Sequence, residues 1–365
     1  MRRPTSERAT VVVKIGSSSL TLGRPGLDVG ALRRVVGHVV SLRERGHSVV
    51  LVTSAAVAAG LPALGIEGRP SDVPGLQAAA AVGQSRLMQA YTEAFDQYGV
   101  TVGQVLLTRN VLADRDQYLH ARQAFERLLA LGVVPIVNEN DTVAIEELRL
   151  GDNDRLAAMV GHLVQAGLLL LLTDTSGIYS SDPRTDETAT LLHAVEHTDS
   201  VLDELTRGAA GPLGSGGIST KIAAARMAAW SGVPTVIAPA EAEDVAVRAV
   251  NGADVGTWIE PRAQRLPARK LWIAFGQPSE GRIVIDAGAR TAITRGGSSL
   301  LPVGVVGVEG DFAAGAAAEV AGPDGALVAK GVSRFAAEEL RRRAGHRSEN
   351  GEVAIHRDDL IVLTS

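Results

Sequence analysis

The sequence predicts an α/β protein with a doubly wound, mainly parallel sheet, followed by a small, mostly β domain. Two observations predict this. Up to about residue 260, apolar runs rich in Val, Ile and Leu alternate with amphipathic segments of helical period, as in a parallel sheet with crossover helices. After Glu260 the chain changes to short β-like pieces separated by glycines, which is typical of a small β domain. The expected boundaries are 1–262 for the first domain, 263–278 for a linker and 279–365 for the second domain.

The first elements have clear start and stop signals. The run 10–15 (TVVVKI) reads as a strand that closes on a Gly-Ser-Ser-Ser turn. Asp28 is placed to cap a helix that runs to Arg45 and stops at Gly46. Strand 133–137 is apolar and β-branched, and 167–173 (GLLLLLT) is a continuous apolar run, as expected for a strand buried on both faces. Further strands are expected at 48–52, 102–108 and 233–238, and further helices at 77–98, 117–131 and 221–230.

The second domain is predicted from shorter signals. A proline-rich stretch with several basic residues precedes it and reads as the connector. The expected strands are 281–286, 292–294, 303–308, 318–320, 328–332, 353–355 and 360–363.

Composition excludes several classes of function. The chain has 365 residues, 45% of them apolar and 21% charged, so it has enough apolar residues for two buried cores. The net charge of −5 does not favour nucleic acid or an anionic membrane as a partner, and 3% aromatic residues offer few stacking surfaces for bases. There is no Cys, which excludes disulfides and disfavours a closed zinc site. No signal-peptide core or membrane span is evident, so we expect a cytoplasmic protein.

Two polar clusters flank one strand end and one helix start. Residues 138–141 (NEND) follow the strand at 133–137, and residues 151–154 (GDND) precede a helical run. Ligands of open α/β sheets collect at such strand ends, so the clusters predict a binding site. Helix capping by Asp152 or Asn153 is the competing interpretation. An EF-hand is excluded, because Leu156 stands where an oxygen ligand is required.

A glycine-rich loop and two lysines suggest a bound polyphosphate. Residues 211–221 (GPLGSGGISTK) allow backbone N–H groups to approach phosphate at a helix start, and Lys221 is expected in the first helical turn. Lys14 lies near the end of the first strand and could reach the same phosphate. The competing interpretations are a flexible linker for the loop and a snorkelling side chain for Lys14. The spacing is not that of a Walker A loop, and the first turn lacks the glycines of a dinucleotide fingerprint. Two cations near carboxylates suit phosphoryl transfer.

These stretches together resemble the amino acid kinase family. VVVKIGSSSL, VTSAAVAAG, PIVNENDTVA, GDNDRLAA, LLLLTDTSGIYSSDPR and GSGGISTK occur in the family's order, and the C-terminal AGHRSE and VAIHRDD resemble a PUA domain. The resemblance covers nearly the whole chain. It is to those members that phosphorylate glutamate in the first step of proline biosynthesis.

The resemblance implies ATP-dependent phosphorylation of the γ-carboxylate of L-glutamate, with ATP and Mg²⁺. It implies that Lys14 and Lys221 stabilise the transferring phosphoryl group and that Asp154 orients them. By the same resemblance Ser54, Asp141 and Asn153 hold glutamate. The residues implied for ATP are Lys14, Thr173, Asp174, Ser215, Gly216, Gly217, Ile218, Ser219, Thr220 and Lys221.

The resemblance also implies partners: L-proline as feedback inhibitor, a homo-oligomer, and a glutamyl phosphate reductase that uses the product. No membrane partner is expected. Two alternatives stay open, namely a sibling kinase that acts on another carboxylate and an RNA-binding protein that uses the C-terminal domain. Residues 279–365 hold ten Lys and Arg against twelve Asp and Glu, which does not favour RNA. Their basic cluster is Lys330, Arg334, Arg341–Arg343 and Arg347.

One residue departs from the family pattern. The family usually has Gly directly after the substrate serine, and this chain has Ala55. If the backbone there adopts a positive φ, the methyl group costs about 1 kcal/mol.

Overall fold

The chain forms two compact units, Met1–Arg265 and Leu266–Ser365. The computed structural model describes residues 5, 8–108, 111, 114–143, 153–196, 202, 205, 216–263, 265–347 and 351–363. None of the helices in these ranges combines the length and apolar character needed to cross a bilayer.

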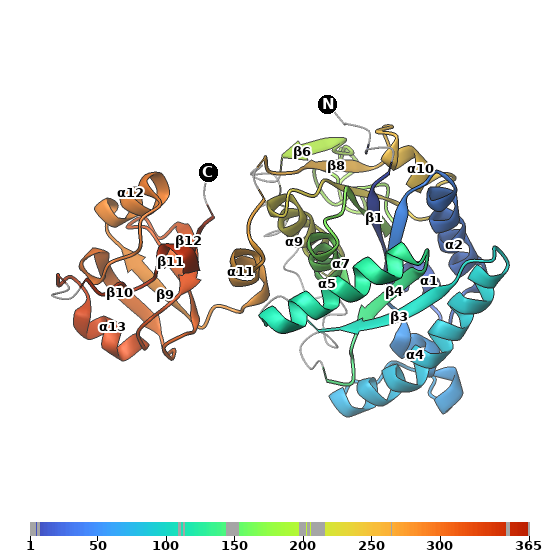
Figure 1. Ribbon diagram of the computed structural model, residues 1–365, viewed down its shortest axis with the longest axis horizontal. Coiled ribbons are helices and arrows are strands. Elements are labelled where there is room, and N and C mark those ends of the chain that lie inside the picture. The colour runs from blue at the N-terminus through green and yellow to red at the C-terminus, as the bar shows by residue number, and fades with distance from the viewer. Residues whose placement is uncertain are drawn as a thin grey trace. The chain divides into compact units, whose positions relative to one another are not determined.

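The first unit alternates strands and helices (Figure 1). Its strands are β1 (Thr10–Ile15), β2 (Ser48–Val52), β3 (Val102–Leu107), β4 (Val134–Glu139), β5 (Leu168–Thr173), β6 (Ala194–Glu196), β7 (Thr235–Pro239) and β8 (Thr257–Glu260). Its helices are α1 (Ser17–Thr21), α2 (Val29–Glu44), α3 (Ala56–Gly60), η1 (Pro62–Leu64), α4 (Val73–Asp96), α5 (Arg115–Ala130), α7 (Asn153–Leu163), α9 (Gly216–Trp230) and α10 (Val245–Val250).

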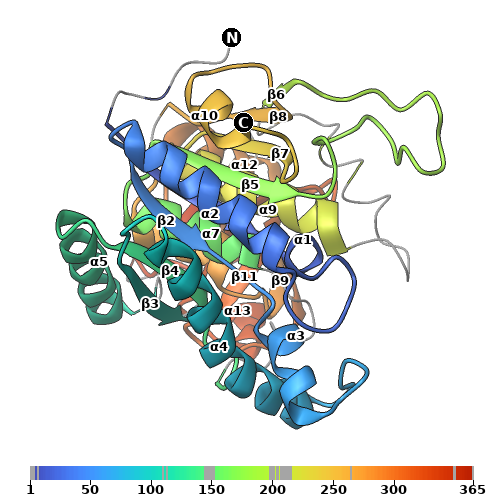
Figure 2. The same cartoon turned by 90° about the vertical axis from the view of Figure 1, so that its right-hand side faces the viewer.

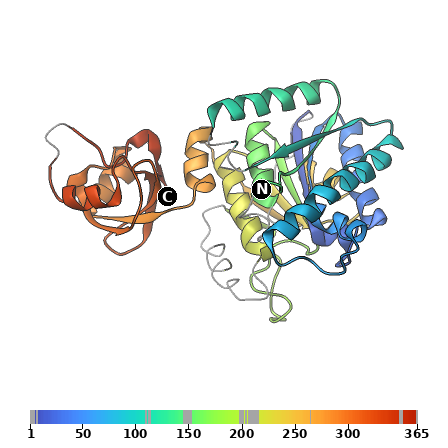
Figure 3. The ribbon, with the colours of Figure 1, turned by 90° about the horizontal axis from the view of Figure 1, so that it is seen from below.

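The eight strands form one sheet in the order β3-β4-β2-β1-β5-β7-β8-β6. All neighbouring pairs are parallel except β7 and β8, which run antiparallel. Helix α2 contacts α4 and α10, whereas α7 contacts α5 and α9, and Figures 2 and 3 show these two groups on opposite faces of the sheet. The predicted doubly wound, mainly parallel sheet is therefore confirmed.

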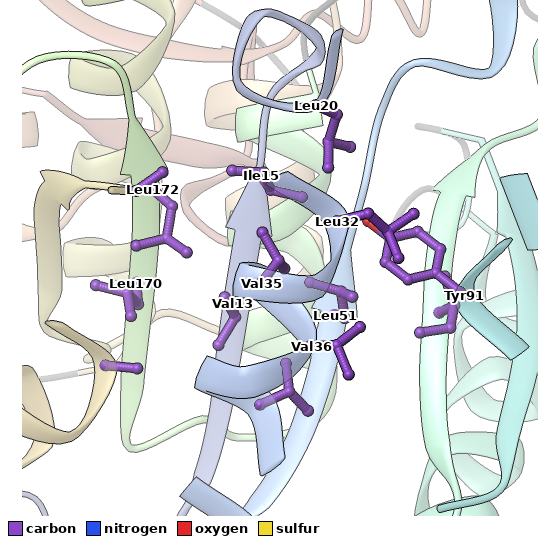
Figure 4. Close-up of a cluster of buried hydrophobic side chains, with 14 of the residues drawn as sticks. Val13, Ile15, Leu20, Leu32, Val35, Val36, Leu51, Tyr91, Leu170 and Leu172 are labelled. Carbon is purple, nitrogen blue, oxygen red and sulfur yellow. The ribbon is translucent and has the colours of Figure 1, made fainter. Parts of the chain in front are cut away.

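The core lies between the central strands and helix α2 (Figure 4). Val13 of β1 has Leu51 of β2 on one side and Leu170 of β5 on the other, and Val35 and Val36 of α2 pack in the same cluster. Each of these side chains is at most 2% exposed. Burying one such side chain stabilises the fold by about 1.5–3 kcal/mol, so the position of β1 between β2 and β5 is firmly fixed.

Strand β4 is longer than predicted. The sequence suggested that the strand stops before Asn138, because its amide and the next carboxylate are costly to bury. In the structure Asn138 and Glu139 continue β4 beside Leu106 and Leu107 of β3 and are only 2% and 3% exposed. Backbone pairing with β3 and hydrogen bonds to the Asn138 side chain offset the cost of burial.

The second unit has a five-stranded sheet in the order β10-β9-β11-β12-β13. Its elements are α11 (Ala268–Leu271), η3 (Trp272–Gly276), β9 (Gly281–Ile285), α12 (Ala287–Gly296), η4 (Pro302–Gly304), β10 (Val305–Gly310), β11 (Ala317–Ala321), β12 (Leu327–Val332), α13 (Ala337–Arg343), η5 (Arg357–Asp359) and β13 (Leu360–Val362). The mostly β character is confirmed, but residues 292–294 are helical rather than extended. Asp286, whose side chain accepts a 2.7 Å hydrogen bond from the Ala289 N–H, starts that helix. Residues 353–355 form a single bridge through Ile355.

The stretch expected to be a linker is largely helical. Helix α11 and the turn η3 lie within 263–278, and η3 contacts β12 and β13 of the second unit. Leu271 and Ile273 are fully buried, so the segment is packed and is not a free connector.

The basic side chains of the second unit make internal contacts. Lys330 is buried and donates to the carbonyl oxygens of Ala274 and Gln277. Arg341 donates to the carbonyl oxygens of Val308 and Gly310. Arg343 pairs with Glu339 and Glu352 and lies over the ring of Phe335. Three of the six side chains in the predicted basic cluster are thus engaged within the unit.

Ala55 has the positive φ that the sequence analysis considered for this position. Its φ is +79° and its ψ is 12°, in the left-handed region between β2 and α3. A side chain with a Cβ in this region costs roughly 1–2 kcal/mol, so Ala55 stores strain beside the expected substrate serine.

We predict that Ala55→Gly raises the free energy of unfolding by about 1 kcal/mol, because Gly relieves the strain. Urea denaturation is the measurement. Ala56→Gly is the matched control: Ala56 is helical and buried, so this change should lower stability by about 1 kcal/mol. Equal destabilisation by both substitutions would contradict the strain at Ala55.

Candidate functional site

A carboxylate at the start of α7 holds two lysines. Lys14 Nζ of β1 lies 2.5 Å from Asp154 Oδ1, and Lys221 Nζ of α9 lies 3.1 Å from Asp154 Oδ2. The hydroxyl of Thr220 donates to the same Oδ2 at 3.0 Å. The Lys14 and Asp154 side chains are 5% and 2% exposed and that of Lys221 is 12% exposed. Three elements that are distant in sequence therefore meet at one carboxylate.

The carboxylate stays ionised although it is buried. Burial alone would raise the pKa of Asp154, but the charges of Lys14 and Lys221 and their hydrogen bonds outweigh it, so the pKa lies below its usual value. Asp154 also lies in the first turn of α7, where the helix dipole favours a negative charge. The anion can therefore hold both ammonium groups in place.

The residue before Asp154 serves the other half of the site. Asn153 Nδ2 lies 2.5 Å from the carbonyl oxygen of Thr53, 3.0 Å from Ser54 Oγ and 2.7 Å from Asn138 Oδ1. The side chain thus bridges the ends of β2 and β4 through its Nδ2 atom. Ser54 and Asn153, predicted together for substrate, are in direct contact.

Thr53, Gln84 and Tyr91 of this cluster were absent from the predicted set, and Asn138 was predicted only as part of the polar cluster 138–141. Asn138 Nδ2 donates to Gln84 Oε1 at 2.8 Å, and the hydroxyls of Thr53 and Tyr91 are 2.8 Å apart. Gln84 and Tyr91 both come from α4. A polar residue at a core-facing position of an amphipathic helix was the signal that could have indicated Gln84.

Asp141 follows β4 in a half-buried turn. Neighbouring contacts fix that turn: the Asn140 N–H donates to the Leu107 carbonyl at 2.8 Å, and Gln77 Nε2 donates to the Thr142 carbonyl at 3.1 Å. The structure thus places Asp141 at the carboxyl end of β4, where the sequence predicts it.

The residues expected to hold the nucleotide lie at the ends of β5 and α9. Thr173 ends β5, next to β1 in the sheet, and its hydroxyl donates to Asp174 at 3.1 Å. Gly216, Gly217, Ile218 and Ser219 form the first turn of α9. Because α9 begins at Gly216, Lys221 lies in the second turn and not in the first. Ser215 and the Gly151 and Asp152 part of the second polar cluster lie outside the described residues.

Comparisons with known proteins identify the family of the chain. Residues 9–239 match the model of the amino acid kinase family, and residues 281–353 match that of the PUA domain. This chain belongs to the amino acid kinase family.

Curated members of the amino acid kinase family resemble the chain over nearly their whole length. Glutamate 5-kinase of Pelobacter propionicus is 45% identical, with 97% of each chain covered. The enzymes of the same name from Geobacter metallireducens and Burkholderia cenocepacia are 45% and 44% identical, with 97% and 100% of each chain covered. The similarity to relatives of this one name thus spans both the kinase-family region and the PUA region of the chain.

We predict that Asp154→Asn lowers the free energy of unfolding by about 3 kcal/mol at pH 7, because Lys14 and Lys221 lose their anionic partner. The lowered pKa of Asp154 gives the pH dependence. Its ionised form stabilises the native state above the ordinary pKa of 3.8, and this contribution is lost as the pH falls through the lower native pKa.

Urea denaturation from pH 7 to pH 3 measures the free energy of unfolding of the wild-type protein and of Asp154→Asn. The difference between these two free energies should narrow below about pH 4. Asp96→Asn, at an exposed position of α4, is the control and should leave stability nearly unchanged. A gap that widens towards low pH would contradict the charge assignment.

Proposed function

We propose that the chain is an ATP-dependent kinase that phosphorylates the γ-carboxylate of L-glutamate to give L-glutamyl 5-phosphate, the first step of proline biosynthesis. The observation that carries the proposal is the pair of lysines on the buried Asp154, directly beside the amide and hydroxyl cluster of Ser54 and Asn153. The names of the full-length relatives support the same substrate.

The composition of the chain supports a special role for the two lysines. The sequence has only four lysines among 36 Lys and Arg residues, and two of the four meet at Asp154. A compact ammonium differs from the planar guanidinium in size and in the directions of its hydrogen bonds. Most of the basic residues in the chain are arginines. Lysine at these two positions suits a compact charge that must follow a moving phosphoryl group.

The proposed reaction needs positioning and charge neutralisation more than proton transfer. An oxygen of the γ-carboxylate attacks the γ-phosphorus of ATP, the new O–P bond forms, and the bond from that phosphorus to the ADP oxygen breaks. The carboxylate is already ionised near neutral pH, so no general base is required. We assign to Lys14 and Lys221 the stabilisation of charge on the transferring group, and to Asp154 the spacing of the two ammonium groups.

The binding roles complete the proposal. Ser54, Asp141 and Asn153 would hold glutamate. The nucleotide would lie against Thr173, Asp174 and the start of α9, residues Ser215 to Lys221. Among the described residues no group of three or more His, Asp or Glu side chains could hold a metal. We propose that Mg²⁺ arrives bound to the phosphates of ATP, as Mg²⁺ commonly does, where its charge would offset that of the phosphates.

The remaining partners belong to the same proposal. L-proline carries the same α-ammonium and α-carboxylate groups as glutamate, so we expect it to inhibit by competing for overlapping contacts. The product is a reactive acyl phosphate, which suits prompt use by a glutamyl phosphate reductase. We also propose a homo-oligomeric, cytoplasmic enzyme, with no role for RNA.

The test is a coupled assay of ADP release from Mg-ATP with single carboxylic acids. Glutamate should support turnover, and added hydroxylamine should trap a γ-hydroxamate. Turnover with aspartate, carbamate or acetylglutamate but not with glutamate would instead favour a sibling kinase.

We predict that Lys14→Ala and Lys221→Ala each lower kcat roughly 10²–10³-fold, because each removes a donor to developing charge. The KM for glutamate should change much less. Lys14→Arg and Lys221→Arg keep the positive charge but replace the compact ammonium with a planar guanidinium. We expect each of these variants to lose at least tenfold in kcat.

The matched control for these variants is Lys270→Ala. Lys270 donates to backbone carbonyls of the second unit and should be dispensable for catalysis. A rise in glutamate KM without loss of kcat in the Lys14 and Lys221 variants would show that their roles are misassigned.

We propose a domain boundary at Arg265, and we predict that a protein truncated there folds and still phosphorylates glutamate. All the described candidate site residues precede this point. The Arg262 N–H donates to the Ala229 carbonyl at 2.9 Å, and its guanidinium lies 4.2 Å from the centre of the Trp230 ring. Circular dichroism and the ADP assay are the measurements.

A protein truncated at Gly256 is the control and should fail to fold, because it lacks β8, which joins β7 and β6. If the protein ending at Arg265 folds but is inactive, the second unit must complete the active site.

A further inference from the structure

Helix α4 reaches the substrate half of the site with two polar side chains. Gln84 and Tyr91 are seven residues apart and therefore share one face of the helix. Gln84 Oε1 accepts from Asn138 at the end of β4, and the Tyr91 hydroxyl bonds that of Thr53 at the end of β2. One helix thus contacts both strand ends between which Asn153 lies.

The position of α4 is fixed by direct contact between backbones. A Cβ built on Gly83 would lie 1.7 Å from the Ala56 carbonyl oxygen, and one on Gly60 would lie 2.0 Å from the Ala79 carbonyl oxygen. Helices α3 and α4 can approach this closely only because neither glycine has a side chain. Gln84 is the residue after Gly83, so its backbone has little freedom to move relative to α3 and Ser54.

The backbone determines the orientation of each amide in the cluster. The Glu139 N–H can only donate, and it donates to Asn138 Oδ1 at 2.9 Å. The Thr53 carbonyl can only accept, and it faces Asn153 Nδ2. With Asn138 Oδ1 fixed in this way, Asn138 Nδ2 points to Gln84, so Gln84 must present its oxygen.

This order of donors determines what the site offers to a ligand. Ser54 Oγ accepts from Asn153, so the hydroxyl has its own hydrogen to donate elsewhere. Asn153 uses its NH₂ group within the protein, which leaves its carbonyl oxygen as the acceptor that it can offer. A donor next to an acceptor suits the carboxylate and ammonium groups of an amino acid.

Only one end of the Gln84 amide has a hydrogen-bond partner among the described residues. Its Nε2 atom is buried without a hydrogen-bond partner among the described residues. A buried donor left in this way is unfavourable by about 1–3 kcal/mol. A glutamine at this position is explained if its other amide atom, Oε1, has a function as the acceptor for Asn138.

We propose that Gln84 is a positioning residue for the amino acid substrate, which acts by holding Asn138 and, through it, Asn153. Gln84 has no need to touch the substrate for this role. The inference rests on the proposed function, since it assigns a residue to glutamate affinity.

The experiment is steady-state kinetics of the full-length protein. Gln84→Met keeps the length of the side chain but removes the oxygen that accepts from Asn138. The buried Nδ2 group of Asn138 then loses this hydrogen-bond acceptor. The KM for glutamate should rise about tenfold, which corresponds to about 1.4 kcal/mol. We expect kcat and the KM for ATP to stay within about threefold, since the lysines are untouched.

Three further variants test the route of the effect. Gln84→Glu keeps an acceptor for Asn138 and should recover most of the glutamate affinity. Gln84→Ala should behave as Gln84→Met does. Gln89→Met is the control, because Gln89 lies on the exposed face of α4 and donates to Glu93; it should leave both KM values unchanged.

A double-mutant cycle tests whether Gln84 acts through Asn138. In an Asn138→Ala background, Gln84→Met should raise the glutamate KM no further. Effects of the two changes that multiply, or a Gln84→Met protein with unchanged glutamate KM, would overturn the proposal. KM does not depend on the concentration of active enzyme, so a partly folded preparation still decides. If wild-type protein does not phosphorylate glutamate, it is the proposed function that fails.

Discussion

The ionised carboxylate of Asp154 is the constraint on which the rest of the site depends. Two ammonium groups brought this close inside a protein repel one another unless an anion lies between them. Each oxygen of Asp154 takes one lysine, and Thr220 adds a hydrogen bond to the second oxygen. The ends of β1, α7 and α9 must therefore converge to within a few ångströms, and the parallel sheet provides that convergence at the carboxyl ends of its strands.

The first two residues of α7 face two different groups. Asp154 faces the lysines, whereas Asn153 faces the strand ends of β2 and β4. Because both belong to one helix, the backbone of that helix would set the spacing between the phosphoryl group and the acceptor carboxylate in the proposed reaction. An in-line transfer depends on such fixed spacing. The other two lysines of the chain, Lys270 and Lys330, donate to backbone carbonyl oxygens, so lysine is kept where a compact donor is needed.

The sequence predicted the elements whose signals are local. Strands such as β1 and β5 are continuous apolar runs, and α2 has an aspartate cap and a glycine stop, so periodicity and capping were sufficient. Helix α12 was missed because a short Ala- and Thr-containing run was read as extended, although Asp286 carries the cap signal. Lys14 and Lys221 were singled out from their local sequence context, but the role of Asp154 between them was identified through a resemblance, since no spacing shows that residues 14, 154 and 221 touch. Gln84 and Tyr91 were missed because their partners Asn138 and Thr53 are up to 54 residues away in sequence.

Arg341 has a consequence for how the protein behaves at high concentration. It donates to the carbonyl oxygens of Val308 and Gly310 on β10, the edge strand of the second sheet. Exposed acceptors on an edge strand are a template on which a strand from another molecule can add, and exposed Val306 would make that addition more favourable. By giving two of these acceptors a partner within the same chain, the guanidinium group places a bulky cation across the open edge. Arg341, which belongs to the basic cluster considered under the RNA alternative, thus covers part of an open sheet edge.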